Sequence, residues 1–134
     1  MALTLLILGL ASASDSVILD VTVTGMRNDS GVVRVALHSS SSTFPAAVPA
    51  FGIIAETSGQ TASARFEVPV GDYAVSVHHD ENENSVFETA IFGIPREGFG
   101  SSTRVRRLGP PRYSDSVFYL EEDHTVRIAL NYLL

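Results

Sequence analysis

The chain has 134 residues, with 9 lysines and arginines against 15 aspartates and glutamates, a formal net charge of −6 and no cysteine. This length predicts one compact domain, and the absence of cysteine excludes disulfides, cysteine-bound zinc and thiol catalysis. The negative charge argues against general nucleic-acid binding, which needs a basic surface, and favours the binding of cations.

Residues 1–14 predict a signal peptide. An apolar run from Ala2 to Leu10 precedes Ala11-Ser12-Ala13, a small-x-small pattern that is typical of a signal-peptidase site. The run is too short to cross a bilayer, which takes about 20 residues, and we expect no transmembrane segment elsewhere. We therefore expect residues 15–134 to form a periplasmic or secreted domain. The alternative is that the apolar run is a buried first strand.

The rest of the chain predicts about seven short strands, because apolar and polar residues alternate through most of it. The predicted strands cover residues 16–24, 33–37, 51–57, 61–68, 73–79, 116–120 and 125–132. The first two, joined by a turn at 25–31, are expected to form a hairpin. With no convincing helix, the pattern favours a single antiparallel β-sandwich of immunoglobulin-like or transthyretin-like kind.

Residues 80–114 form a long connection with little alternation. Connections of this length tend to be either functional or disordered. This one contains several apolar side chains, and its glycines can adopt a positive φ. We therefore expect an ordered loop inserted between strands, folded onto the sandwich as a cap.

The start of this connection resembles a calcium-binding loop. Side-chain oxygens at 80, 82 and 84 match positions 1, 3 and 5 of such a loop, and hard cations take six to eight oxygen ligands. The candidate metal ligands are the side chains of Asp80, Asn82, Asn84 and Glu88 and the carbonyl of Val86. Glu81 and Glu83 are expected to face solvent.

Two positions depart from the calcium-loop pattern. Ser85 stands where a glycine eases the sharp turn, and Ile91 stands where an EF-hand has its bidentate glutamate. We therefore expect a single loop with a dissociation constant of about 0.1–1 mM, as in extracellular modules. The alternative is that Asp80, Asn82 and Asn84 only make Asx turns, which need no metal.

His78 and His79 are candidate zinc ligands or general bases. Zinc needs three or four converging ligands, whereas adjacent residues on a strand point to opposite faces. We expect His79 at the rim of the sandwich, on the apolar face that begins at Tyr73, hydrogen-bonded to loop backbone. His78 is then on the other face.

Four arginines follow the acidic segment, at positions 104, 106, 107 and 112. We expect them to pair with carboxylates of residues 80–88 or with Glu97, which would close the long connection on itself. The alternative is that they bind an anionic glycan or a phosphate.

Three segments together resemble a known family. They are His79-Asp80-Glu81-Asn82-x-Asn84, Phe92-Gly93-Ile94-Pro95-x-Glu97-Gly98-Phe99-Gly100-Ser101 and Gly109-Pro110-Pro111. They resemble the bacterial family called domain of unknown function 2141, small exported proteins with motifs close to HDxNxNGxxD and FGxPxEGYGFS. The resemblance implies a secreted or periplasmic β-rich domain with no established activity. The residues expected to organise the loop are His79, Gly93, Pro95, Glu97, Gly98 and Gly100.

Three hypotheses about function follow from these patterns. The leading hypothesis is a non-enzymatic exported β-sandwich whose 80–88 loop binds calcium, orders the following segment and presents a surface to an envelope protein or glycan. The alternative is a hydrolase acting on envelope carbohydrate or ester, with His79 and the carboxylates of Asp80, Glu88 or Glu97 as acid and base. A third hypothesis is an accessory protein whose exposed strand edge pairs with a partner.

Overall fold

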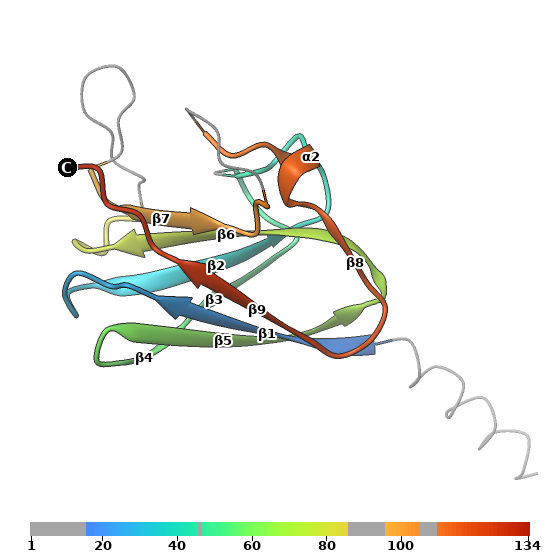
Figure 1. Cartoon of the computed structure of the whole chain (residues 1–134), viewed down its shortest axis with the longest axis horizontal. Coiled ribbons are helices and arrows are strands. Elements are labelled where there is room, and N and C mark those ends of the chain that lie inside the picture. Colours follow the sequence, from blue (N-terminus) through green and yellow to red (C-terminus); the bar gives the residue numbers. More distant parts are fainter. Residues whose placement is uncertain (1–15, 46, 86–95, 105–109) are drawn as a thin grey trace, which may run out of the picture.

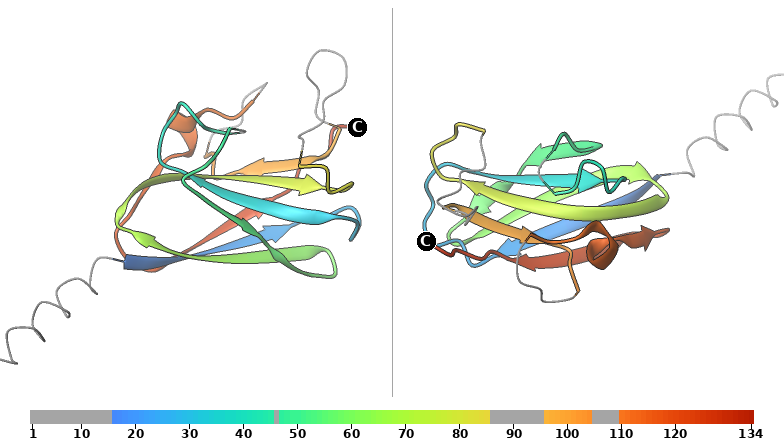
Figure 2. Two further views of the ribbon diagram at one scale, coloured as in Figure 1. Left: turned by 180° about the vertical axis from the view of Figure 1, so that it is seen from behind. Right: turned by 90° about the horizontal axis from the view of Figure 1, so that it is seen from above.

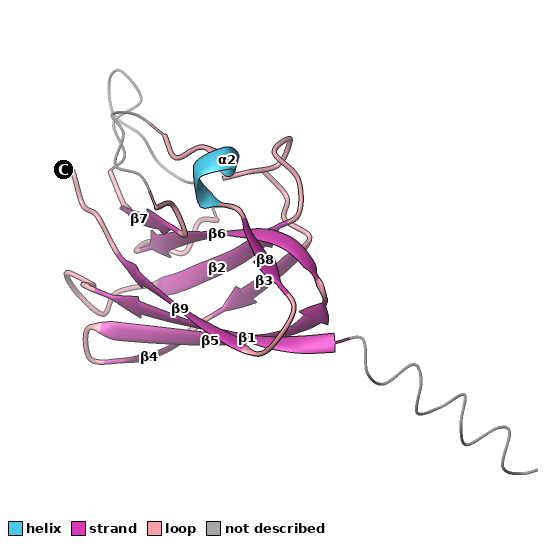
Figure 3. Ribbon diagram, turned by 45° about the vertical axis from the view of Figure 1, so that its right-hand side comes forward, coloured by secondary structure: helices cyan, strands magenta, loops and turns pink. Residues whose placement is uncertain are grey.

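The computed structural model describes residues 16–45, 47–85, 96–104 and 110–134. Two β-sheets pack face to face (Figure 1), and Figure 3 shows that strands make up most of the described chain. The elements are β1 (Ser16–Thr24), β2 (Val32–His38), β3 (Phe51–Ile54), β4 (Glu56–Ser58), β5 (Thr61–Pro69), β6 (Gly71–Asp80), β7 (Gly98–Ser101), α2 (Tyr113–Ser116), β8 (Phe118–Leu120) and β9 (His124–Ala129). The structure thus confirms the predicted all-β sandwich.

The two sheets have different strand orders. The first is β4-β5-β1-β9 and the second is β3-β2-β6-β7, with β8 paired to the start of β6. Figure 2 shows the two layers from behind and from above. The described strand pairs are antiparallel except for β1 with β9, which is parallel. At one corner a bridge between Phe99 and Asn131 joins the layers.

The core lies between the sheets because alternate residues of each long strand face inward. In β1 the inward positions are fully or almost fully buried, and β2, β5 and β6 repeat the pattern. The buried side chains include Leu19, Val21, Val23, Val33, Val35, Leu37, Phe66, Val68, Val75 and Val77. Each fully buried side chain of this size contributes about 1.5–3 kcal/mol to folding. The same alternation places the even-numbered residues of β6 on the outer face of the second sheet.

The predicted hairpin between residues 16–24 and 33–37 is wrong. β1 pairs with β5 and β9, whereas β2 pairs with β3 and β6 in the other sheet. The connection at 25–31 crosses between the sheets, with Met26 buried in the core and its N–H donating to the Gln60 carbonyl. Burial of this apolar side chain stabilises the crossing between the sheets. A tight hairpin turn would not need a buried apolar residue.

Two other segments differ from the predicted strands. Residues 51–57 form two strands, because the chain passes from the second sheet to the first at the buried Ala55. The predicted connection 80–114 contains β7, which pairs with β6. The chain also makes one turn of helix, α2, before β8.

Some predictions fall outside the described residues. These include the signal peptide at 1–14 and the parts of the connection at 86–95 and 105–109. Within the described part of the chain, the structure has no helix long and apolar enough to span a membrane.

Candidate functional site

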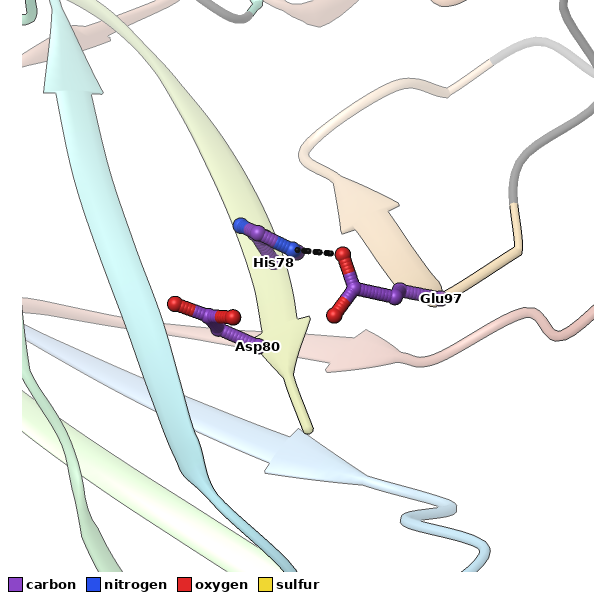
Figure 4. Close-up of side chains that lie close together, drawn as sticks. All are labelled: His78, Asp80 and Glu97. Carbon is purple, nitrogen blue, oxygen red and sulfur yellow. Dashed lines mark hydrogen bonds and ion pairs between the residues drawn. The ribbon is translucent and has the colours of Figure 1, made fainter. Parts of the chain in front are cut away.

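The candidate site lies where β6 ends and the chain turns into the loop at 81–85. Strand alternation places His78 and Asp80 on the outer face of the second sheet and His79 on the inner face. Glu97, just before β7, lies beside the first two (Figure 4). Arg34 of β2 lies opposite His78 in the register, so it belongs to the same outer face.

Asp80 is fully buried and its carboxylate is surrounded by donors. Oδ2 accepts hydrogen bonds from Nε of Arg34 and from the backbone N–H of Ser85, both at 2.9 Å, and Oδ1 accepts one from the N–H of Asn84 at 3.2 Å. Burial raises the pKa of this carboxyl, but the hydrogen bonds from Arg34 and Ser85 outweigh it, so the pKa lies below its ordinary value. Asp80 is therefore held as a charged acceptor at the start of the loop.

The loop turns sharply around this carboxylate. Glu83 and Ser85 have φ values of 56° and 64°, in the left-handed region that glycine normally occupies. Ser85 stands at the sixth position of the predicted calcium loop, where the pattern has glycine. The turn therefore forms with a serine at this position, and Oδ1 of Asn82 accepts a hydrogen bond from the N–H of Asn84 at 3.4 Å.

A neighbouring turn packs tightly against the same point. Gly31, with φ of 66°, lies so close to the end of β6 that an added Cβ would be 2.1 Å from the Asp80 carbonyl oxygen. Only glycine fits this position, because both the backbone angle and the close approach exclude a side chain. The turn at 25–31 and the loop at 81–85 therefore form one packed end of the molecule.

Glu97 connects the loop to β6 from the other side. Its Oε1 lies 2.9 Å from Nε2 of His78, and its Oε2 accepts a hydrogen bond from the N–H of Glu81 at 3.2 Å. Ligand atoms of His78, Asp80 and Glu97 all lie within 4.8 Å of one another, so these three side chains could hold a divalent cation. Glu97 is 5% exposed, so this contact is largely shielded from solvent.

His79 occupies a separate, inner site. It is fully buried, with Nδ1 at 2.6 Å from the Tyr132 hydroxyl and Nε2 at 2.7 Å from the Ser30 carbonyl. Because a carbonyl can only accept, Nε2 of His79 carries a proton and donates it to Ser30. The predicted acid–base pair of His79 with Asp80 is not formed, since the two side chains lie on opposite faces of β6. His79 does bond to backbone, as expected.

Glu81 is paired, contrary to the expectation that it faces solvent. Its Oε1 lies 2.6 Å from Nη2 of Arg27, and its Oε2 accepts from Asn28 Nδ2 at 2.7 Å. The hydrogen bond from Arg27 is the largest influence and holds the pKa of Glu81 below its ordinary value. The Arg27 guanidinium also lies 4.6 Å from the centre of the Tyr132 ring.

Two arginines that the sequence did not mark pair with this part of the chain. Among the described residues, Asp80 pairs with Arg34 and Glu81 pairs with Arg27. Of the arginines predicted to pair here, Arg106 and Arg107 lie outside the described part of the chain. The alternation of β2 marks Arg34 as outward-facing, but only the pairing of β2 with β6 brings it to Asp80. Arg34 could not be assigned from the sequence without that pairing, and Arg27 could not be assigned because it lies in the connection that crosses between the sheets.

The remaining predicted site residues divide into two groups. Gly98 and Gly100 face inward, where an added Cβ would lie 2.5 Å from the Tyr132 ring and 2.6 Å from Cγ2 of Ile128. They therefore allow β7 to pack closely against the C-terminal segment. The predicted residues that lie outside the described part of the chain are Val86, Glu88, Gly93 and Pro95.

Comparison with known proteins identifies the family. The family described as an uncharacterized protein conserved in bacteria, DUF2141, matches residues 21–128, which include most of both sheets and the site. No curated protein and no solved structure matches the chain. The match covers most of the 134 residues, and the chain belongs to the DUF2141 family.

Proposed function

We propose that this protein is an exported binding module, in which calcium stabilises the loop after β6 and so presents a surface to an envelope protein or a glycan. The observation that carries the proposal is the path of residues 81–85 around the Asp80 carboxylate. The N–H groups of Asn84 and Ser85 both point to this carboxylate. A loop that already curls around its first ligand needs little reorganisation to receive an ion.

The donors around Asp80 leave room for one more partner. A carboxylate has about four acceptor sites, and Arg34, Ser85 and Asn84 use three of them. Oδ1, which accepts only the 3.2 Å bond from Asn84, is the oxygen we assign to the ion. Arg34 then stays in place on Oδ2 and fixes the orientation of the carboxylate, as residues that hydrogen-bond to metal ligands do.

The neighbouring carboxylates support cation binding in a second way. Asp80 and Glu97 are both buried, and their charges face one another across the cluster with His78. Arg34 pairs with Asp80, and Nε2 of His78 lies 2.9 Å from Oε1 of Glu97. A cation bound among these side chains would be attracted by both carboxylates, so its binding should stabilise the folded protein.

Thermal unfolding with and without calcium tests the proposal. For a dissociation constant of about 1 mM, calcium at about 10 mM should stabilise the wild type by about 1.4 kcal/mol, or roughly 4–7 °C in Tm. The shift should disappear in Asp80→Asn and shrink in Asn82→Ala, whose side chain is exposed and whose loss should leave the fold intact. Asp29→Asn, in the exposed neighbouring turn, is the matched control and should keep the full shift.

The presented surface has its own test. Binding of an envelope fraction to the immobilised protein should require calcium and should be lost in Asn82→Ala. A wild-type Tm that chelator and calcium leave unchanged would overturn the calcium proposal. If calcium raises the Tm but capture of the envelope fraction does not depend on calcium, the metal has only a structural role and the proposed binding function is wrong.

A further inference from the structure

Three polar side chains joined by hydrogen bonds lie at the end of β2 that is farther from Asp80, beside the middle of β6. Nε2 of His38, the last residue of β2, is 3.0 Å from the Ser76 hydroxyl, and its Nδ1 is 3.0 Å from the Thr43 hydroxyl. His38 is fully buried beneath the segment that follows β2, with the Phe44 ring 5.4 Å away edge-on. Phe44 in turn contacts Tyr113 of α2, which lies beside this segment in Figure 1.

The hydrogen bonds of Thr43 determine which of the three side chains donate and which accept. The Thr43 hydroxyl donates its proton to the Ser40 carbonyl at 3.3 Å, so its oxygen can only accept from His38. Nδ1 of His38 therefore carries the ring proton, and Nε2 has a free lone pair. The Ser76 hydroxyl must then donate to Nε2. This is the arrangement in which an imidazole can remove a proton from a serine.

The register places small side chains on both sides of Ser76. Ala36 of β2 and Ser101 of β7 lie directly opposite it on the two neighbouring strands, so all three share the outer face. Each of the three is partly exposed. The serine oxygen is therefore flanked by small residues, whereas the histidine is buried. Burial lowers the pKa of His38, which keeps its ring neutral near neutral pH.

We infer that Ser76 is a nucleophile toward carbonyl and phosphonyl electrophiles, with His38 as its general base and Thr43 as a positioning residue. With an ester, the Ser76 oxygen bonds to the acyl carbon and its proton moves to Nε2 of His38. The bond to the alcohol oxygen then breaks, and the alcohol leaves with that proton. The Ser101 hydroxyl, opposite Ser76, is the side chain we assign to the negative charge that develops on the carbonyl oxygen.

This inference goes beyond the proposed binding function and depends on different residues. Asp80 and the calcium loop take no part in the chemistry, so either proposal can fail without the other. It also differs from the hydrolase expected from the sequence, which required His79. The base here is the histidine that no sequence motif marked, because its partner Ser76 lies 38 positions away along the chain.

Labelling with a biotinylated fluorophosphonate tests the inference on the folded wild-type protein. The Ser76 oxygen should bond to phosphorus, fluoride should leave, and the serine proton should pass to His38. Peptide mapping of the labelled wild type should place the adduct on Ser76. This readout needs no variant, so it holds even if a substitution at Ser76 or His38 prevents folding.

Variants then assign the roles. Ser76→Ala should abolish labelling, and His38→Gln should slow it at least about tenfold, since a general base contributes about 10²–10⁴-fold. Thr43→Val should slow labelling and Thr43→Ser should restore it, which a loss of packing alone would not predict. Ser58→Ala, on the exposed β4, is the matched control and should label at the wild-type rate. Absence of an adduct, or an adduct on another residue, would overturn the inference.

Discussion

Single residues determine how the loop end of the sandwich packs. Gly31 permits two chain segments to approach, and Ser85 accepts a left-handed backbone angle that costs a non-glycine residue about 1–2 kcal/mol. The hydrogen bond from the Ser85 N–H to Asp80 offsets part of this cost. The charged Asp80 is thus the feature that makes the strained turn stable.

Substitution of Gly31 by alanine should destabilise the protein strongly. The new Cβ would overlap the Asp80 carbonyl, and the residue would keep an unfavourable φ, so we expect a loss of about 3 kcal/mol or more in the free energy of unfolding. Gly59→Ala is the control, because Gly59 has a φ of 61° but nothing within 4 Å of its added Cβ. It should lose only about 1–2 kcal/mol. Urea unfolding of both variants measures the difference, and equal losses would contradict the packing explanation.

At the scale of elements, the loop end is held by contacts between strands that are distant in the sequence. Arg34 of β2 pairs with Asp80 at the end of β6, and the fully buried carboxylate depends on that partner. The pair crosses the ladder between two central strands of the second sheet. Its loss should therefore affect the attachment of the loop to the sheet.

Arg34→Met should destabilise the fold by about 1.5–3 kcal/mol, because it removes a hydrogen bond to a buried charged group. Arg65→Met is the matched control, since Arg65 pairs with Asp20 on the exposed face of the first sheet. It should have a much smaller effect. Chemical unfolding measures both changes. A loss in Arg34→Met no larger than that in Arg65→Met would show that the buried pair is not a main support of the loop.

The elements also show how far the sequence predicts this structure. The alternation of apolar and polar residues identified β1, β2, β5 and β6. Each of these strands buries one face, so every second residue is apolar. The alternation could not give the partners, so the hairpin of β1 with β2 was wrong. β7 was missed because its inward residues, Gly98 and Gly100, have no apolar side chain to mark a buried face.

Only part of the candidate site could be predicted, because the sequence does not show which strands pair. Asp80, Asn82 and Asn84 are close in the sequence, so a local motif could identify the loop. Arg34, Glu97 and His78 meet them only through strand pairing, which local spacing does not encode. The pairing of Ser76 with His38 is equally non-local. The sequence therefore identifies the loop and names Glu97 and His78 as candidates, but it does not show that these two residues and Arg34 meet at Asp80.

The whole molecule should respond to acid in two stages, because groups at its two ends have pKa values lowered by different causes. Burial lowers the pKa of His38, so the unfolded chain binds a proton more readily than the folded one. Stability should therefore be complete above the ordinary histidine pKa of about 6.5 and fall as the pH drops below it. The carboxyls of Asp80 and Glu81 also have lowered pKa values, but here the charged form is the one stabilised. Their contribution is present above the ordinary carboxyl pKa of about 4 and is lost as the pH falls through their lowered values.

Urea midpoints measured from pH 8 to pH 3 test this order. The wild-type midpoint should begin to fall below about pH 6.5 and fall again below about pH 4. His38→Gln should remove the first fall and keep the second, whereas Asp80→Asn should keep the first and weaken the second. His124→Gln, at an exposed position on β9, is the control and should follow the wild type. A first fall that persists in His38→Gln would contradict the assignment to His38, because a variant that lacks this histidine cannot take up a proton there.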